Sequence, residues 1–155
     1  MKRILALLLA VCMILALAAC GTQGENKPQT KTDEKGFYSY DGYVVKTDYP
    51  LDEDSVNKAA EKIKNIYDMY LEGTNVQAYY SIVPDKNYCI GAEAGIDTID
   101  YKKMVDLMKL KTDYMPYLDI TGLLGITDYY KTDAHWRQEK ITDVAAKLAE
   151  AMGVS

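Results

Sequence analysis

Residues 52–84 read DEDSVNKAAEKIKNIYDMYLEGTNVQAYYSIVP, and this stretch decides the predicted fold. Its first part, residues 52–73, predicts a helix, because acidic residues occupy the first turn, apolar residues recur every three or four positions and Gly73 ends the pattern. Its second part, residues 76–83, is rich in β-branched residues and tyrosine and ends at Pro84, which is typical of a strand. Together with the strand-like residues upstream of 52, a helix followed by a strand indicates a βαβ unit.

The flanking segments extend this pattern in both directions. Upstream, residues 37–45 (FYSYDGYVV) predict a β-hairpin that turns at Asp41-Gly42. Downstream, we expect a turn at 85–87, a helix over 100–111, a strand over 117–120, a turn or brief helix over 121–126, and a final helix from His135 or Trp136 to Met152. Alternating strands and helices predict an α/β fold with a mostly parallel sheet. Such a sheet would continue after the last helix, so we expect the sheet to be incomplete.

The N-terminus predicts export and lipid anchoring. Residues 1–19 carry a short basic region followed by an apolar run, as in a signal peptide. The sequence LAACG around Cys20 resembles the bacterial lipobox, which implies a lipid anchor on Cys20 and a place on the outer side of the membrane of a bacterial cell envelope. The alternative is a secreted protein with a chance cysteine at this position. Residues 20–36 contain no large apolar side chain and predict a flexible tether.

Charge and composition exclude several classes of function. The formal net charge of −5 argues against nucleic acid as a partner. Of the 3 cysteines, Cys12 and Cys20 belong to the leader and its end, so Cys89 has no partner for an internal disulfide. With 1 histidine, no tetrahedral zinc set can be assembled, and no glycine-rich phosphate loop indicates a nucleotide cofactor. We therefore predict no metal and no cofactor.

The motif YYKTDAHW at residues 129–136 carries the candidate chemistry. Asp133 precedes His135 by two residues, and a carboxylate at that spacing can accept from Nδ1–H, fix the imidazole tautomer and leave Nε2 free. Asp133 and His135 are the predicted catalytic pair. The alternative is structural, with Asp133 as the N-cap of the final helix and His135 packed beside it.

This motif resembles the signature of the DHHW family of bacterial envelope proteins, which are related to the SGNH-hydrolase-like domains of alginate O-acetylation proteins. Residues 42–47, residues 81–87 and the segment around Tyr101 look like the same family. The resemblance implies that residues 37–155 are the truncated N-terminal part of an SGNH-hydrolase-like three-layer sandwich. It also implies esterase or O-acyltransferase chemistry on envelope carbohydrate, with the catalytic pair as two members of a triad. Ala134 stands where the DHHW family has its first histidine.

The third member of the triad is not found in the sequence. In the relatives the nucleophilic serine lies C-terminal to the Asp-x-His pair, and none of the serines here has the strained glycine-rich setting of a nucleophile (Ser39, Ser55, Ser81 and Ser155). Cys89 is a possible thiol nucleophile, but it has no basic neighbour that would lower its pKa, which favours an inert cysteine. We expect this chain by itself to lack a nucleophile.

The aromatic residues suggest a ligand surface. The chain has 14 tyrosines against 1 phenylalanine and 1 tryptophan, and tyrosine combines an apolar face suited to sugar rings with a polar tip. Tyr129, Tyr130 and Trp136 adjoin the motif and are the predicted substrate-binding residues. The rival to an enzyme is therefore a non-catalytic lipoprotein that binds surface carbohydrate.

Overall fold

The computed structural model describes residues 30–154. The predicted signal peptide, the predicted lipidation site Cys20 and the first part of the predicted tether lie outside the described residues. Residues 33–36 form a turn in which the Asp33 side chain accepts from the backbone N–H groups of Lys35 and Phe37, both at 2.8 Å. Gly36 O in turn accepts from Thr47 N at 2.9 Å. The end of the predicted tether is thus bound to the folded part.

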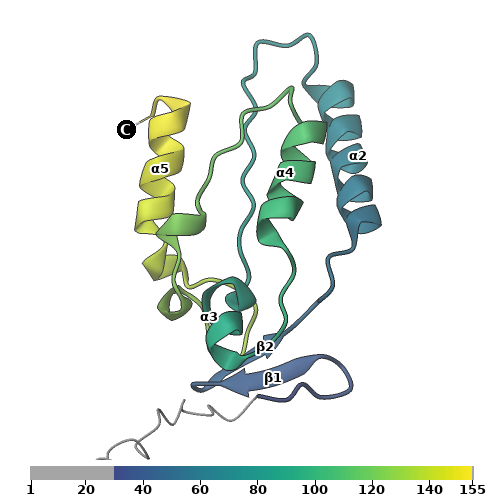
Figure 1. The fold of residues 1–155 in the computed structure, drawn as a ribbon. Helices are drawn as coiled ribbons and strands as arrows, with labels where there is room; N and C mark the ends of the chain where they lie inside the picture. The colour runs from purple at the N-terminus through teal and green to yellow at the C-terminus, as the bar shows by residue number, and fades with distance from the viewer. Residues whose placement is uncertain (1–29, 155) are drawn as a thin grey trace, which may run out of the picture.

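The predicted hairpin is confirmed. Strands β1 (Phe37–Tyr40) and β2 (Tyr43–Lys46) pair antiparallel, with Phe37 opposite Lys46 and Tyr40 opposite Tyr43. Asp41 and Gly42 form the two-residue connection with φ values of 47° and 78°, the left-handed conformation that Asp-Gly adopts readily in such turns. Figure 1 shows this hairpin at the base of the molecule.

Two of the predicted helices form one packed pair. Helix α2 (Glu53–Tyr70) begins at an Asp52 N-cap and helix α4 (Tyr101–Lys111) at an Asp100 N-cap. The two helices lie side by side, and Val56 and Ala60 of α2 form a buried cluster with Met108 of α4. The apolar spacing that predicted these helices is therefore the spacing of their shared core.

Helix α3 (Lys86–Ala94) replaces a predicted turn. Asp85 is its N-cap and accepts from Tyr88 N, and Gly95 ends it with φ of 69°. The apolar pattern missed this helix because Lys86 and Asn87 in its first turn are buried although they are polar.

The predicted α/β three-layer sandwich with a mostly parallel sheet is wrong. Within residues 30–154 the sheet consists of β1 and β2 alone. Residues 76–83 and 117–120 do run parallel, but they share a single bridge between Tyr80 and Tyr117, with Tyr80 N donating to Pro116 O at 3.1 Å and Leu118 N donating to Tyr80 O at 2.8 Å. Proline at residues 84 and 116 has no N–H to extend a ladder in either segment.

The C-terminal part consists of short 3₁₀ turns followed by helix α5 (Thr142–Met152). The turns are η1 (Thr121–Leu123), η2 (Ile126–Asp128) and η3 (Gln138–Lys140). The final helix thus begins later than predicted. Its buried Val144 packs with Ile120, Leu124 and Tyr129 in a second core.

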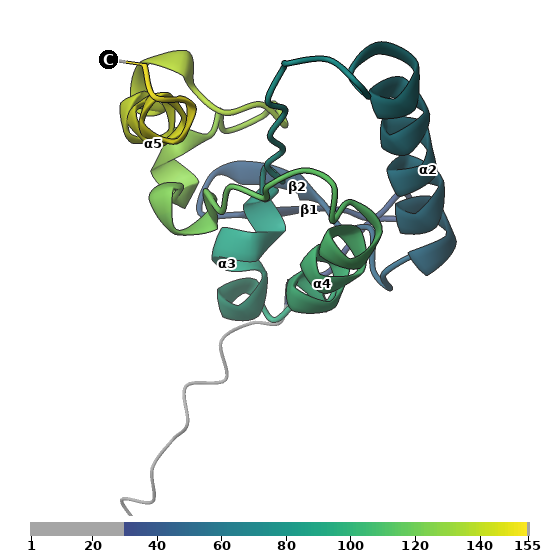
Figure 2. The same cartoon turned by 90° about the horizontal axis from the view of Figure 1, so that it is seen from above.

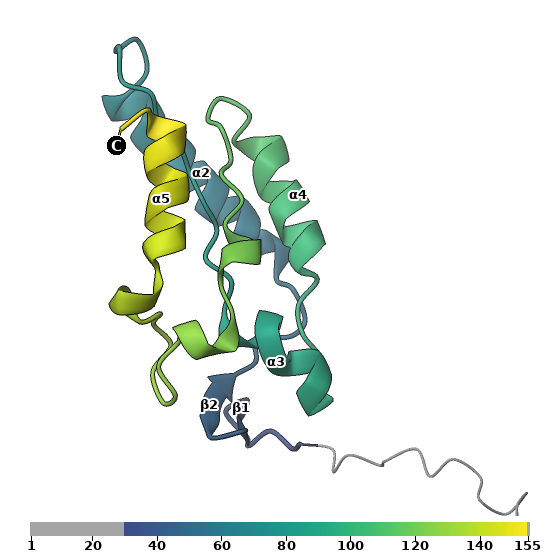
Figure 3. The ribbon, with the colours of Figure 1, turned by 90° about the vertical axis from the view of Figure 1, so that its left-hand side faces the viewer.

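Three of the helices lie on two sides of the extended segments. Figures 1 and 2 show α5 on one side and the α2–α4 pair on the other, with residues 76–83 and 117–120 between them. Figure 3 shows the chain from another side, with α3 and the hairpin together at the base. The described helices include none with the length and apolar character needed to cross a membrane.

Candidate functional site

The motif lies in a hairpin-like loop between η2 and η3. An antiparallel bridge joins Tyr129 to Trp136, and Tyr130 N donates to His135 O at 3.1 Å. One step further out, Arg137 N donates to Asp128 O at 2.6 Å. These bonds close the loop, so residues 131–135 are presented on the surface by a hydrogen-bonded stem.

The predicted acid–base pair is in contact. Asp133 Oδ1 accepts from the backbone N–H of His135 at 2.7 Å and lies 2.5 Å from His135 Nδ1. An acceptor at Nδ1 places the proton of a neutral imidazole on that nitrogen and leaves Nε2 as the free acceptor. The two side chains are 57% and 82% exposed, so Nε2 is accessible to a reactant.

Several groups stabilise the ionised carboxylate of Asp133. The largest cause is the hydrogen bond from His135 N, followed by the bond from the imidazole, and the positive charge of Lys86 adds to them. Together these hold the pKa of Asp133 below its usual value. The pair is therefore poised with an ionised aspartate next to the imidazole.

The alternative role of Asp133 as a helix cap does not agree with the structure. Helix α5 begins at Thr142 and its N-cap position is Ile141, which makes no side-chain capping bond. Asp133 instead forms a local turn with the N–H two residues ahead, as aspartate commonly does in loops. The carboxylate thus orients the imidazole and shapes the loop.

An open groove of about 590 Å³ adjoins the pair. Its lining comprises Tyr130, Thr132, Asp133, His135, Trp136 and Gln138. Tyr130 is 45% exposed and Trp136 is half-buried, so an aromatic ring is accessible on each limb of the loop. The groove has the size of a small-molecule site.

The predicted substrate contacts do not all lie together. Tyr130 and Trp136 line the groove, but Tyr129 is 2% exposed and belongs to the core with Val144. The Tyr129 hydroxyl donates to Pro84 O at 2.5 Å. Only Tyr130 and Trp136 therefore offer rings that a ligand can reach.

None of the serines in residues 30–154 lines the groove. Ser81 Oγ donates to Leu118 O at 2.8 Å, and Ser55 Oγ donates to the Asp52 carboxylate at 2.7 Å. Ser39 lies in the middle of β1, and Ser155 lies outside the described residues. The described part of the chain therefore brings no serine hydroxyl to the groove beside His135.

Cys89 does not fill this gap. It is half-buried on α3 and packs against two of the buried clusters. Burial, followed by the negative charges of Asp85 and Asp128, raises the pKa of its thiol. A thiol with a raised pKa is a poor nucleophile, which supports the interpretation of an inert cysteine.

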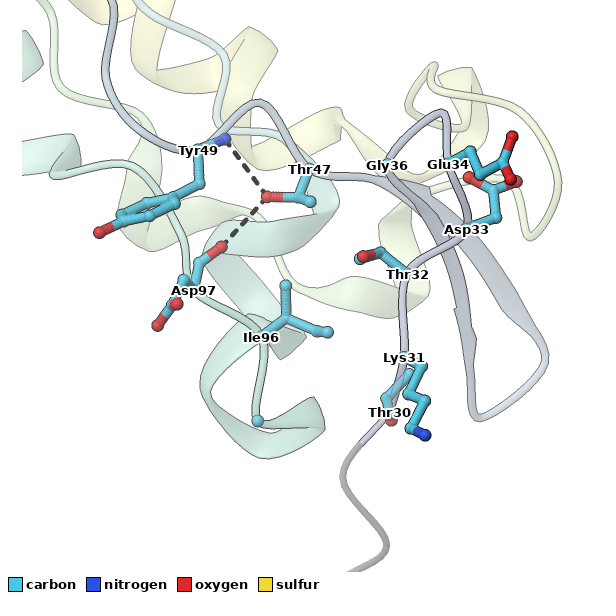
Figure 4. Close-up of a pocket in the computed structure, with 11 residues that line it drawn as sticks. Thr30, Lys31, Thr32, Asp33, Glu34, Gly36, Thr47, Tyr49, Ile96 and Asp97 are labelled. Carbon is cyan, nitrogen blue, oxygen red and sulfur yellow. Dashed lines mark hydrogen bonds between the residues drawn. The ribbon is translucent and has the colours of Figure 1, made fainter.

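A second hollow lies at the base of the molecule. Figure 4 shows it between residues 30–36, the segment after β2 and the end of α3. There Thr47 Oγ1 donates to Asp97 O at 3.1 Å and accepts from Tyr49 N at 3.4 Å. The predicted site residues do not line this hollow. Within residues 30–154 no group of three or more histidine, cysteine, aspartate or glutamate side chains could hold a metal ion.

Sequence reasoning missed two buried polar residues in the first turn of α3. Lys86 and Asn87 are each 4% exposed, and both bind backbone carbonyls of neighbouring segments. The sequence held no signal for them, because residues 85–87 were predicted to form a turn, in which lysine and asparagine are ordinary residues.

Comparison of the chain with known protein families, with curated proteins and with solved structures gives no match. The DHHW-like motif therefore stays a prediction from the sequence, and the geometry of the site carries the functional argument.

Proposed function

We propose that this chain is a cell-envelope lipoprotein whose Asp133–His135 pair is the acid–base half of an ester hydrolysis or O-acyl transfer site for carbohydrate. The observation that carries the proposal is the 2.5 Å contact between Asp133 Oδ1 and His135 Nδ1 beside an open groove. A fixed tautomer with a free Nε2 is what a general base needs.

The chemistry follows from the free nitrogen. His135 Nε2 takes the proton of a hydroxyl group as its oxygen attacks the acyl carbon of an ester. The same proton then returns to the departing alkoxide, so the imidazole ends neutral. Asp133 stabilises the imidazolium in between. In hydrolysis the attacking hydroxyl belongs to water and the acyl group leaves as the acid, whereas in transfer it belongs to an acceptor sugar, which becomes the new ester. No serine of residues 30–154 lines the groove to act as an intermediate acyl carrier.

The groove favours a carbohydrate substrate. Tyr130 and Trp136 present aromatic surface on both limbs of the loop, and Thr132 and Gln138 add hydrogen-bonding groups. Aromatic faces with polar neighbours suit sugar rings, which have apolar C–H faces and hydroxyl edges. The lipobox-like sequence at Cys20 also favours a carbohydrate substrate, because a lipid anchor there would hold the protein among envelope polysaccharides.

One observation favours a second function. Since no described serine lines the groove, the same aromatic residues could serve a non-catalytic lipoprotein that binds carbohydrate. In that case Asp133 and His135 would contribute hydrogen bonds to the sugar and no proton transfer.

An ester turnover assay on the full-length protein separates the two functions. We expect 4-nitrophenyl acetate and an O-acetylated polysaccharide to be turned over by the unchanged protein, with a loss of about 100-fold or more in His135→Ala and a large loss in Asp133→Asn. Glu139→Gln is the matched control, because Glu139 pairs with Arg137 near the groove but does not line it. Polysaccharide binding without turnover by the unchanged protein would favour the binder and reject the enzyme.

A further inference from the structure

Lys86 is a buried cation held by backbone carbonyl groups. It is 4% exposed at the start of α3, and its Nζ donates to Val44 O at 2.5 Å, Lys131 O at 3.1 Å and Tyr130 O at 3.2 Å. An ammonium group has three donors, so these bonds use all of them.

Its location needs an explanation, because a buried charge is costly. The ion pairs described within residues 30–154 do not include Lys86. Burial lowers the pKa of Lys86, and the charge of Asp133 offsets part of that effect. A helix N-terminus also disfavours a cation. The three carbonyl dipoles are therefore the main partners that hold this charge in place.

The carbonyls belong to two separate segments. Val44 lies in β2, whereas Tyr130 and Lys131 form the first limb of the motif loop. Val44 N also donates to Lys131 O at 2.7 Å, so Lys131 O binds both β2 and the ammonium. The motif loop, β2 and α3 meet at this one oxygen.

The aromatic ring of Tyr43 reinforces the same junction. Lys86 Nζ lies 5.9 Å and Lys131 Nζ 5.6 Å from the ring centroid, within the range of cation–π attraction. Tyr43 is buried, so its ring is a fixed surface for both ammonium groups. Lys131 is thus held through its carbonyl and its side chain, two residues before Asp133.

We infer that Lys86 is a positioning residue, which holds the motif loop against β2 and thereby fixes Asp133 and His135 beside the groove. The anchoring of the loop stands on the described contacts alone. Its consequence for turnover rests on the proposed function.

Hydrogen exchange tests the anchoring directly. In the full-length Lys86→Met variant we expect the Val44 amide, which donates to Lys131 O, to exchange about tenfold faster or more, because the loop opens more often. The emission of Trp136, the single tryptophan, should shift as its environment changes. Lys103→Met is the control, because Lys103 is exposed and bonded to Glu53 on the α2–α4 side. Exchange of the Val44 amide within about twofold of the unchanged protein would overturn the inference.

A measurement on the unchanged protein covers the case in which Lys86→Met does not fold. A buried ammonium with three bonded protons exchanges them slowly, so its ¹⁵N-coupled proton signal should be visible by NMR and that of Lys103 should be broadened by exchange with water. Equal exchange of the two ammonium groups would show that Lys86 is not held by the carbonyls.

Kinetics separates positioning from mere folding. If the unchanged protein turns over an ester, Lys86→Met should lower kcat more than it raises KM, because proton transfer depends more steeply on geometry than the aromatic contacts that bind substrate. An unchanged kcat would refute the positioning role. Absence of turnover in the unchanged protein would count against the proposed function only, and the exchange measurements would still decide the anchoring.

Discussion

The two neighbouring tyrosines before the motif provide a matched test of the structure. Tyr129 is 2% exposed and its hydroxyl donates to Pro84 O at 2.5 Å, whereas Tyr130 is 45% exposed at the groove. Replacement by phenylalanine removes the same single oxygen from each. Any difference between the two variants therefore reports the environment of that oxygen.

The structure sets the expected magnitude. An intramolecular hydrogen bond contributes about 0.5–1.5 kcal/mol net, and a buried acceptor that loses its donor costs about 1–3 kcal/mol. Pro84 is itself buried, so we expect Tyr129→Phe to lower the free energy of unfolding by about 1–2 kcal/mol. Tyr130→Phe should change it by less than about 0.5 kcal/mol, as is usual for a surface position.

Urea unfolding followed by far-UV circular dichroism measures both values. The urea dependence of the free energy should be the same in the two variants and the unchanged protein, so that a shift in midpoint reports stability alone. Equal stability of Tyr129→Phe and Tyr130→Phe would refute the placement of Tyr129 in the core. A loss of carbohydrate affinity in Tyr129→Phe but not in Tyr130→Ala would refute the assignment of the groove.

Three further predictions concern other parts of the chain. Gly91→Ala should destabilise the protein by about 1–3 kcal/mol in urea, because the added Cβ would lie 2.3 Å from Thr98 Cγ2, whereas Gly122→Ala, which meets no atom within 4 Å, should not. Asp133 has a lowered pKa in the folded loop, so its contribution to loop order is present above the ordinary aspartate pKa and is lost as pH falls through the folded value. Amide signals of the motif loop in NMR spectra should therefore broaden at acid pH, and Asp133→Asn should abolish that transition. Cys20→Ser should release the protein from membranes in cell fractionation, and retention of the variant would contradict a lipid anchor on this residue.

Local features of the sequence predicted the elements that depend on local energetics. The hairpin was predictable because Asp41 and Gly42 accept positive φ values, and α2 was predictable because its capping aspartate and apolar spacing lie within one segment. The contact of Asp133 with His135 was predictable for the same reason, since two residues of one turn can meet without a partner from a distant segment. These predictions required only neighbouring residues.

Features that depend on distant segments were not predictable. Residues 76–83 have strand-forming side chains and do adopt an extended path, but a ladder requires a partner with matching N–H and C=O groups over several residues. The bridge at Tyr80 and Tyr117 provides one such match. The distinction between Tyr129 and Tyr130 is of the same kind, because successive residues of an extended segment point to opposite sides and only the packed core decides which side is inside.

Lys86 shows why an exposed acid–base pair can still have a defined geometry. His135 and Asp133 gain little from burial, and an exposed ionic contact by itself is weak. The order of the loop comes from beneath it, where the Tyr129 hydroxyl binds Pro84 O and the Lys86 ammonium binds carbonyls of the first limb. The two contacts involve Pro84 and Lys86, which flank Asp85, the N-cap of α3. A loop anchored on its inner side keeps its outer side open to substrate. Because Asp133 and His135 are already in position, substrate binding does not have to supply the free energy of ordering them.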